Sequence, residues 1–484
     1  MSVQNLKIRL HILSPVHIGC DDVYEPTSFV IDEKKGKLIE FDPMDFIKAL
    51  SMKERDEFSK ACNNDNLLQV FKTVKRLYKS SIPGREVDIV SGLIAHYTSV
   101  LKMPTFDKKA VINQFTMNKT AYNLQKNMPY IPGTSFKGSL RTAYLSSIAS
   151  STGIKNWWNE SKAKEKDRAK ELEEKLLQGS FETDPFRMVK VSDFLPVKEV
   201  KTKIVYGVNK KKKKSEKPTK ADSGPPQIFE AIQHGAVFEG LINIHQPLSK
   251  SIIKYPVEKD NLLKAIHEFY MKAFEKEKKI AEEIGTGLID VSNFNGMLGK
   301  SAFLIRLGRH SGAEAVTIEG NRLIKIMQKQ GDPPKYSKDG ATTLWLSSET
   351  SKPTSNNGLI PFGWALLEII PFDVKNIYPS HVVTVEHTIT KSEEAVVKQE
   401  TIPVTKTIQS QTLLWKNANL SWSPGDLTLK ANNKASLRLK SLDEAKKFVP
   451  EQFHRKLFIK KEPVKAKVMV EQTGNAFRII RVET

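Results

Sequence analysis

Alternation of apolar and polar residues opens the chain. In residues 3–13, leucine and isoleucine occupy the even positions from 6 to 12, and basic residues occupy positions 7, 9 and 11. A period of two is typical of a half-buried strand. Residues 28–32 and 37–41 are also strand-like and flank Glu33-Lys34-Lys35-Gly36, which predicts a β-hairpin.

Helical patterns follow the hairpin from Asp42-Pro43 to about Lys79. We expect further strands over residues 87–100 and 111–117. Residues 155–178 are rich in Lys and Glu and predict a surface helix anchored by Trp157 and Trp158. In the second half we predict a long amphipathic helix at residues 261–284. We also predict five strands, at residues 189–194, 200–208, 227–245, 301–307 and 359–370.

Strands interleaved with helices favour an α+β fold made of two tandem ferredoxin-like, RRM-like domains. The predicted domains cover residues 1–150, with a helical insertion, and residues 181–370. A charged linker helix, residues 151–180, joins them. Residues 371–484 predict a small, basic, β-rich domain, and an OB-type barrel is one arrangement that this pattern allows.

A lysine-rich segment interrupts the second predicted domain. Residues 208–226 contain five consecutive lysines, Lys210 to Lys214, among Ser, Pro and Gly residues that cannot pack together. This composition predicts a disordered loop between two strands. The loop is either simply solvated or a mobile basic finger on RNA.

The composition narrows the class of partner. The 484 residues include 76 Lys and Arg against 55 Asp and Glu, for a net charge of +21. Such a field favours a polyanion, with nucleic acid first and an anionic membrane surface second. Cys20 and Cys62 are too few for a thiolate metal site. We therefore expect neither a metal nor a cofactor. We expect a cytoplasmic protein, because neither a signal peptide nor a membrane span is evident.

One candidate anion site lies at residues 130–141, YIPGTSFKGSLR. The pattern predicts a strand, a Gly turn, and a helix over residues 136–148 with Thr134 and Ser135 near its N-cap. Free N–H groups at a helix start attract anions, and Lys137 and Arg141 lie one turn apart on one face. The alternative is a plain turn with two solvated cations.

A second candidate lies in residues 304–316, where an apolar strand runs into Gly308-Arg309-His310-Ser311-Gly312. Backbone N–H groups in such a turn can form an anion nest, and Arg309 can add a bidentate phosphate contact. A hairpin turn with polar surface residues is the alternative. His17, after the first strand, is a third candidate, as an RNA contact, a general base or a structural residue.

Three stretches together resemble the RAMP superfamily of CRISPR-associated proteins, most closely the filament-end subunit of type III-A (Csm) effector complexes. They are SPVHIG at 14–19, IPGTSFKGSLRTA at 131–143 and LGRHSGAEAV at 307–316. DPFRMVKVSDF at 184–194, FEAIQHGAVFEG at 229–240 and IPFGWALLEI at 360–369 fit the same family. The resemblance covers about residues 1–370.

The resemblance implies a non-catalytic RNA-binding subunit of a ribonucleoprotein. It would bind the 3′ part of the CRISPR RNA, cap a filament of sibling RAMP (Csm) subunits that also holds target RNA, and support guide maturation and antiviral defence. Target cleavage would belong to the siblings. The RNA-binding residues carried over are His17, Gly19, Gly133, Ser135, Lys137, Arg141, Gly308, Arg309, His310 and Gly312.

The residues alone leave two other functions open. A metal-independent endoribonuclease would process guide RNA precursor through His17 or His310, although the spacing fixes no acid–base pair. A purely protein-facing cap would use its charge for solubility. RRM-type readers stack bases on sheet aromatics, and the sequence shows no clear aromatic pair, so we expect backbone contacts without sequence readout.

Overall fold

We describe the protein from a computed structural model, whose chain divides into two compact units, Met1–Val382 and Val383–Thr484. Each unit is described by itself. The structure describes residues 2–64, 66–104, 115–213, 227–248, 251–326, 333–372, 411–423, 428–431, 435–438, 442–473 and 476–483. Among these residues, no helix has the length and apolar character needed to cross a membrane.

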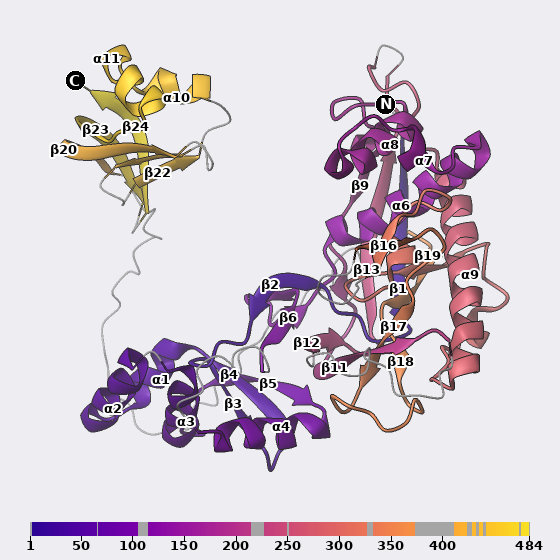
Figure 1. The fold of residues 1–484 in the computed structure, drawn as a ribbon, viewed down its shortest axis with the longest axis horizontal. Helices are drawn as coiled ribbons and strands as arrows, with labels where there is room; N and C mark the ends of the chain where they lie inside the picture. The colour runs from indigo at the N-terminus through magenta and orange to yellow at the C-terminus, as the bar shows by residue number, and fades with distance from the viewer. Residues whose placement is uncertain are drawn as a thin grey trace, which may run out of the picture. The chain divides into compact units, whose positions relative to one another are not determined.

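The first of two large sheets in the first unit is antiparallel and lies beside α6 (Gly133–Thr152) and α9 (Lys259–Ile284) (Figure 1). Its strands follow the order β10-β13-β1-β19-β14, and β9 also pairs with β13. Their bounds are β1 Val3–Ile12, β9 Val189–Val191, β10 Leu195–Pro196, β13 Val237–His245, β14 Ala302–Arg306 and β19 Trp364–Ile370. The predicted first strand is confirmed, because its even-numbered apolar residues are all buried.

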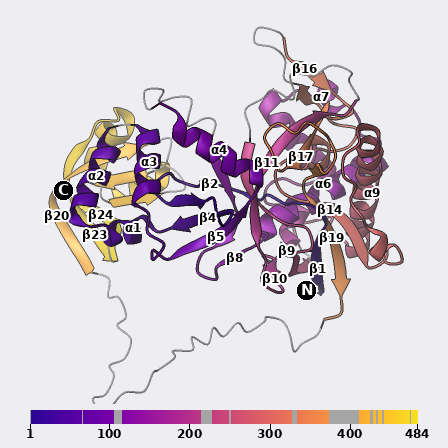
Figure 2. The same cartoon turned by 90° about the horizontal axis from the view of Figure 1, so that it is seen from below.

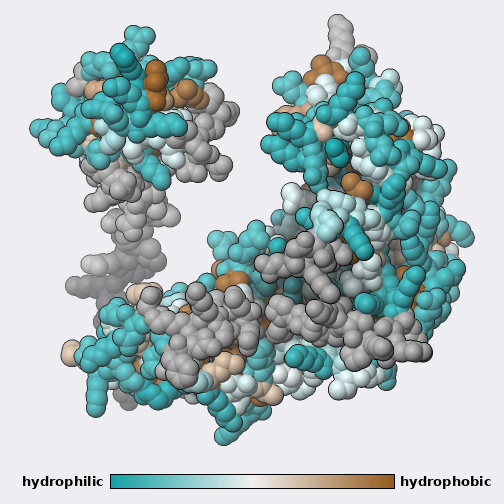
Figure 3. Space-filling view, in the orientation of Figure 1, coloured by the Kyte–Doolittle hydropathy of each residue, from teal (hydrophilic) through white to brown (hydrophobic). Residues whose placement is uncertain are grey.

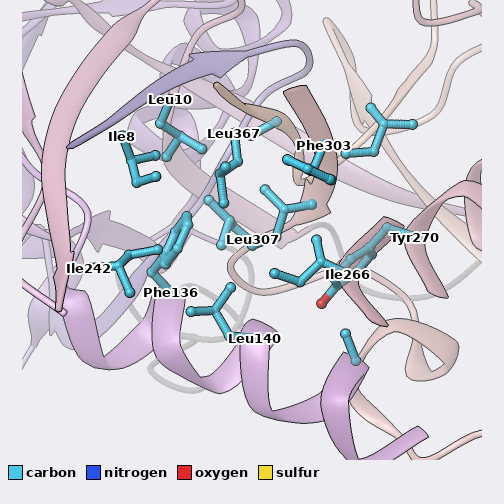
Figure 4. Packing of buried hydrophobic residues seen from close by; sticks show 14 of the residues in the cluster. Ile8, Leu10, Phe136, Leu140, Ile242, Ile266, Tyr270, Phe303, Leu307 and Leu367 are labelled. Atoms are coloured by element: carbon cyan, nitrogen blue, oxygen red, sulfur yellow. The ribbon is translucent and has the colours of Figure 1, made fainter. Parts of the chain in front are cut away.

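Two long helices cover one face of this sheet, α6 (Gly133–Thr152) and α9 (Lys259–Ile284). Figure 4 shows Phe136 and Leu140 of α6 pointing toward Ile8 and Ile242 of the sheet. Along the chain, β1, α6, β9, β13, α9 and β19 occur in the β-α-β-β-α-β order of a ferredoxin-like unit, with other elements between them that include β10 and β14 of the same sheet. The predicted α+β class is therefore confirmed.

The second sheet has the order β2-β6-β12-β11-β5-β4-β3, with β17 on β11 and β18 on β17. Helices α1 to α4 lie beside this sheet (Figure 2). The strands are β2 Gly19–Val23, β3 Phe29–Asp32, β4 Lys37–Phe41, β5 Gly84–Ile89, β6 Met117–Thr120, β11 Thr202–Lys211, β12 Gln227–Ile232, β17 Thr343–Ser348 and β18 Ile360–Pro361. The helices are α1 Pro43–Ala49, α2 Met52–Asn63, α3 Leu67–Leu77 and α4 Ser91–Lys102. The predicted hairpin is confirmed by the pairing of β3 with β4.

Shorter elements complete the first unit. The helical ones are α7 Trp157–Glu160, η1 Glu165–Asp167, α8 Arg168–Leu177, η2 Pro185–Met188, η4 Ser292–Phe294 and η5 Ala313–Val316. The small strands are β7 Tyr122–Asn123, β8 Met128–Pro129, β15 Ile324–Ile326 and β16 Lys335–Ser337. The single linker helix predicted over residues 155–178 is thus divided into α7, η1 and α8.

The strand pairing interleaves the two domains predicted at residues 1–150 and 181–370. β1 pairs with β13 and β19, and β5 pairs with β11. Each sheet therefore combines strands from both halves of the chain. Sequence periodicity could not show this, because it identifies strands but does not say which strands pair over long separations.

Two predicted segments differ from the structure. Residues 87–100 end their strand at Ile89 and continue as helix α4, whose buried Leu93, Tyr97 and Val100 have helical spacing. The lysine-rich loop predicted from residue 208 begins later, because β11 continues to Lys211 through backbone pairing with β17. Residues 214–226 of that loop, and most of the predicted strand at 111–117, lie outside the described residues.

The second unit contains a closed five-stranded barrel and helices. Its elements are β20 Gln411–Ser423, β21 Thr428–Ala431, β22 Ala435–Arg438, α10 Leu442–Phe448, α11 Glu451–His454, the π-helical η7 Arg455–Ile459, β23 Val464–Thr473 and β24 Ala476–Glu483. The predicted start of this region, residue 371, lies just before residues 373–410, which are outside the described residues.

Candidate nucleic-acid interface

Three loops meet where β1 and β14 end. The Arg309 N–H donates to the His17 carbonyl at 2.9 Å, and the Gly363 N–H donates to the Pro15 carbonyl at 2.9 Å. The Leu307 N–H in turn donates to the Gly363 carbonyl at 2.8 Å. These bonds bring residues 14–19 beside residues 308–312, which we call the Arg309 turn. The structure therefore gathers six predicted residues, His17, Gly19, Gly308, Arg309, His310 and Gly312.

Glycine is required at position 308. Its φ is +76°, and a Cβ there would lie 2.3 Å from the His17 carbonyl oxygen. Gly19 faces the same loop, since a Cβ there would lie 3.0 Å from Cδ of Arg309. The absence of these two side chains lets the loops approach closely and places the stem of Arg309 over Gly19.

Arg309 carries the free positive charge of this turn. Its side chain is 57% exposed, and among the described residues its ion-pair partner is Asp21, at 4.0 Å between Nη2 and Oδ1. The Asp21 side chain is itself 94% exposed, so solvent screens this pair and it contributes little. The guanidinium is therefore available to an incoming anion such as a phosphate.

The two histidines beneath Arg309 are neutral at physiological pH. Burial lowers the pKa of His17 to about 4; the hydrogen bond with the Glu230 carbonyl opposes this change, and the charge of nearby Arg309 contributes to it. Burial, followed by electrostatic repulsion from the protonated form of His17 and from Arg309, lowers the pKa of His310 to about 4. The His17 side chain is 1% exposed and its Nδ1 lies 2.7 Å from the Glu230 oxygen. His17 therefore supports the loop from inside.

Aromatic rings form a column through this site. The ring of Phe229 lies 4.7 Å from that of His17 and 4.7 Å from that of His310. The His310 ring lies 4.5 Å from that of Trp345, and both of these residues are half-exposed. Sequence reasoning did not single out Trp345, which follows no motif and reaches the site only because β17 pairs with β11.

A buried carboxylate anchors the strand that carries Phe229. Glu230 is fully buried and accepts hydrogen bonds from Arg85 at 2.8 Å and from the Tyr24 hydroxyl at 2.9 Å. Arg85 also pairs with Glu40, at 3.1 Å. Because a buried charge without partners is costly, this network fixes β12 beneath the loops. The sequence offers no local signal for it, since Glu230 and Arg85 lie far apart along the chain.

The second predicted group, at the start of α6, is already occupied by protein groups. The Gly133 N–H donates to Asp193 Oδ1 at 2.8 Å. Arg141 donates to Glu173 Oε2 at 2.7 Å and to Asp184 Oδ2 at 2.8 Å. The helix also begins earlier than predicted, at Gly133, with Pro132 as its N-cap, so the predicted N-caps Thr134 and Ser135 lie inside its first turn.

Lys137 remains a cation of interest in this second group. It is half-buried, and burial together with the nearby charge of Lys190 lowers its pKa. The two predicted groups are linked through the Ser139 hydroxyl of α6, which donates to the Arg306 carbonyl at 2.8 Å, two residues before Gly308. Arg141, in contrast, serves as an internal ion-pair partner, and its availability for RNA is not supported.

The open face of the first sheet carries pairs of polar side chains. Lys7 and Arg9 lie 3.2 and 2.7 Å from Glu239, and His11 lies 2.8 Å from Glu368. The usual RRM surface stacks bases on aromatic rings of such a face. In this protein the two half-exposed rings described above lie elsewhere: His310 belongs to the Arg309 turn, which follows β14, and Trp345 belongs to β17 of the second sheet.

The sequence model of the RAMP superfamily matches residues 9–303, which is more than half of the chain. The chain belongs to the RAMP superfamily. The matched region includes His17, Gly19, Gly133, Ser135, Lys137 and Arg141, and it ends before the Arg309 turn.

The match to an individual relative covers a smaller part of the chain than the match to the superfamily model. It is 24% identical over 193 residues to the "CRISPR system Cms protein Csm5" of Methanocaldococcus jannaschii. That match covers 39% of this chain and 43% of the relative, so it spans less than half of either protein.

Two solved structures are also similar to this chain. The crystal structure of T. onnurineus Csm5 matches with a TM-score of 0.48 and 18% identity, over 75% of this chain and 100% of that one. A chain from the cryo-EM structure of a Csm–crRNA–target RNA ternary complex of a type III-A CRISPR-Cas system matches with a TM-score of 0.47 and 17% identity, over the same shares.

Proposed function

We propose that this RAMP protein is a non-catalytic, RNA-binding subunit of a type III-A CRISPR (Csm) ribonucleoprotein. The observation that carries the proposal is the exposed Arg309 guanidinium, held over Gly19 in a turn where glycine permits close approach. Membership of the superfamily and the similarity to a Csm5 protein support this assignment. The net charge of +21 favours the same class of ligand.

In this proposal the Arg309 turn holds the phosphate backbone of the 3′ part of the CRISPR RNA. Arg309 makes the charged contact, and the half-exposed rings of His310 and Trp345 offer a surface for a neighbouring base. His17 is a positioning residue, because its side chain is buried. Lys137 at the start of α6 adds a second cation, while Arg141 holds the local structure.

The subunit caps one end of a filament of sibling Csm subunits, shares the assembly with target RNA, and supports guide maturation and antiviral defence. The ribonuclease alternative gains no support from the site. A general base works best with a pKa near the working pH, whereas burial lowers the pKa of both histidines to about 4. We therefore assign binding, and not RNA cleavage, to these residues.

Co-purification tests the proposal. The tagged chain is expressed with the neighbouring proteins of its gene cluster, and the recovered proteins and RNA are identified by mass spectrometry and sequencing. We expect several sibling RAMP proteins and short RNAs that share a repeat-derived 5′ segment, with cross-links to this chain in the 3′ half. Recovery of the chain without partners and without RNA would contradict the proposal.

A cleavage assay with precursor RNA in the presence of a chelator distinguishes the enzymatic alternative. We expect the purified wild-type chain to leave the RNA intact. Cleavage that is lost in His17→Ala or His310→Ala, but kept in His234→Ala, would favour the ribonuclease. His234 is a suitable control because it is exposed and lies outside the Arg309 turn.

A further inference from the structure

The barrel of the second unit has a specific connectivity. Its strands close in the order β20-β21-β22-β24-β23, so the first strand pairs with both the second and the fourth. The pair β22–β24 is parallel and the other pairs are antiparallel. The helices α10 and α11 lie in the chain between the third and fourth strands. This is the five-stranded arrangement of an OB-fold.

The interior of the barrel is apolar, which leaves its outer surface for other roles. Buried Leu420, Leu429 and Val468 come from three different strands, and Leu457 and Phe458 of η7 join the same cluster. Residues between these positions alternate outward along each strand. The outer surface of the strands is therefore not needed for the packing of the barrel.

The outer side of β20 is flanked by lysines on both neighbouring strands. Asn419 is the register partner of Lys465, and Ser421 is the register partner of Lys430. Lys467 lies opposite the bulge between Trp415 and Ala418. We call the four lysines along this strand the β20 strip, which consists of Lys416, Lys430, Lys465 and Lys467.

The strip carries positive charge that the described part of the barrel does not neutralise. Lys416, Lys465 and Lys467 are exposed and Lys430 is half-exposed. Among the described side chains of this unit, the ion pairs are Lys446–Asp443 and Arg481–Glu483, and neither involves the strip. From residue 416 to residue 421 the strand extends about 17 Å, enough to lie along several nucleotides of an extended strand.

We propose that the barrel is a second binding module for single-stranded nucleic acid, with the β20 strip contacting the phosphates. A fold alone does not establish a function, so the proposal depends on the OB arrangement together with the strip lysines, which form no ion pair among the described side chains of this unit. Asn417 is an exposed polar residue and Ser421 a half-exposed one between these lysines, as suits hydrogen bonding to a nucleic-acid backbone. The proposal is independent of the Arg309 turn, which belongs to the first unit.

Salt-dependent binding of the full-length chain to a single-stranded oligouridine RNA provides the test. The variant Lys465→Glu/Lys467→Glu removes two strip cations. The control Lys447→Glu/Lys460→Glu makes the same charge change at exposed lysines outside the strip. For single strands, log K depends on log salt with a slope of about −0.7 per phosphate contact. We therefore expect the slope of the strip variant to be shallower than that of the wild type by about 1.4, and the slope of the control to change little.

Photo-cross-linking with 4-thiouridine RNA and mass spectrometry locates the contact. We expect cross-linked peptides from residues 411–423 and 464–473 in the wild type and the control, and their loss in the strip variant, with unchanged melting temperatures. Equal slopes for both variants, or an absence of barrel cross-links, would overturn the inference. Binding of the strip to phosphatidylserine vesicles, without barrel cross-links to RNA, would overturn it in favour of a membrane surface.

Including Arg309→Gln in the same assays separates this inference from the proposed function. Weaker RNA binding in Arg309→Gln with equal slopes for the two barrel variants would reject only the barrel module. The reverse pattern would reject only the role of the Arg309 turn. The two conclusions therefore fail in distinguishable ways.

Discussion

The start of α6 and the Arg309 turn carry similar sequence signals and use them differently. Each combines a glycine with an arginine that follows it within eight residues of the chain. At α6, Asp193 accepts the Gly133 N–H, and Glu173 and Asp184 hold Arg141. At the Arg309 turn, the arginine is 57% exposed with one carboxylate at 4.0 Å. A glycine and a cation therefore indicate an anion site only where the protein does not supply the anion itself.

The surface of the first unit explains why such a distinction is needed. The face drawn in Figure 3 is mostly hydrophilic, so a polar surface alone does not single out one region. Arg85, Arg141 and Arg306 all have carboxylate partners in the structure. Net charge predicts the class of partner, and the pairing of individual side chains decides where that partner can bind.

The largest expected effect concerns the pH dependence of stability. Of the two regions, only the Arg309 turn is associated with histidines of lowered pKa, the buried His17 and the half-exposed His310. The pKa values of His17 and His310 are about 4, below the ordinary 6.5. Between pH 6.5 and 4 the unfolded chain therefore binds protons that the folded chain does not. Stability should fall as pH decreases through this window, by up to about 3 kcal/mol for each histidine, and should gain nothing from them above pH 6.5.

Urea unfolding at several pH values measures this dependence. His310→Asn removes one titrating ring and keeps a residue that tolerates the local φ of +64°. We expect a shallower loss of stability between pH 6.5 and 5 in this variant than in the wild type. His234→Asn, at an exposed site, should follow the wild-type curve. A His310→Asn curve parallel to the wild type would show that the ring is not held neutral by burial.

An added methyl group should have opposite effects in the two regions. Gly308→Ala places a Cβ against the His17 carbonyl at a φ of +76°, and we expect it to destabilise the first unit by about 1–3 kcal/mol. Gly138→Ala lies in α6 with nothing within 4 Å of its Cβ, and should stabilise by about 0.5–1 kcal/mol. Free energies of unfolding in urea measure both changes. Equal effects would mean that residues 14–19 and the Arg309 turn are not packed as described.

Local sequence patterns predicted most of the regular elements. The alternation in β1, the β3–β4 hairpin and the amphipathic α9 were all correct, because each depends on residues close together in the chain. The grouping of His17 with the Arg309 turn followed from the family resemblance. The interleaving of the two halves was not predicted, since it depends on pairing between strands more than 200 residues apart, as in β1 and β13.

The individual roles in the site were less predictable. Trp345 joins His310 only through the pairing of β17 with β11, and Arg141 is neutralised by residues from α8 and from the segment before η2. Neither contact has a signal at its own position in the sequence. Burial of His17 likewise depends on β12 and its anchored Glu230, which only the folded chain brings together.

The smallest effect comes from exchanging the two arginines for glutamine, and it tests the central claim most directly. Affinity for a fluorescent single-stranded RNA and the melting temperature are measured for Arg309→Gln, Arg141→Gln and a control, Arg76→Gln. The Arg76 side chain is 56% exposed, which closely matches Arg309. Arg76→Gln removes one positive charge, as Arg309→Gln does, but at a position far along the chain from the Arg309 turn.

We expect Arg309→Gln to weaken RNA binding about tenfold, since a hydrogen bond to a charged group contributes about 1.5–3 kcal/mol, and to leave melting unchanged. Arg141→Gln should lower stability by about 1–2 kcal/mol, because Glu173 and Asp184 lose their partner, and should bind RNA like the control. The opposite result, weaker RNA binding at unchanged stability in Arg141→Gln together with full binding in Arg309→Gln, would contradict the assignment of the RNA contact to the Arg309 turn.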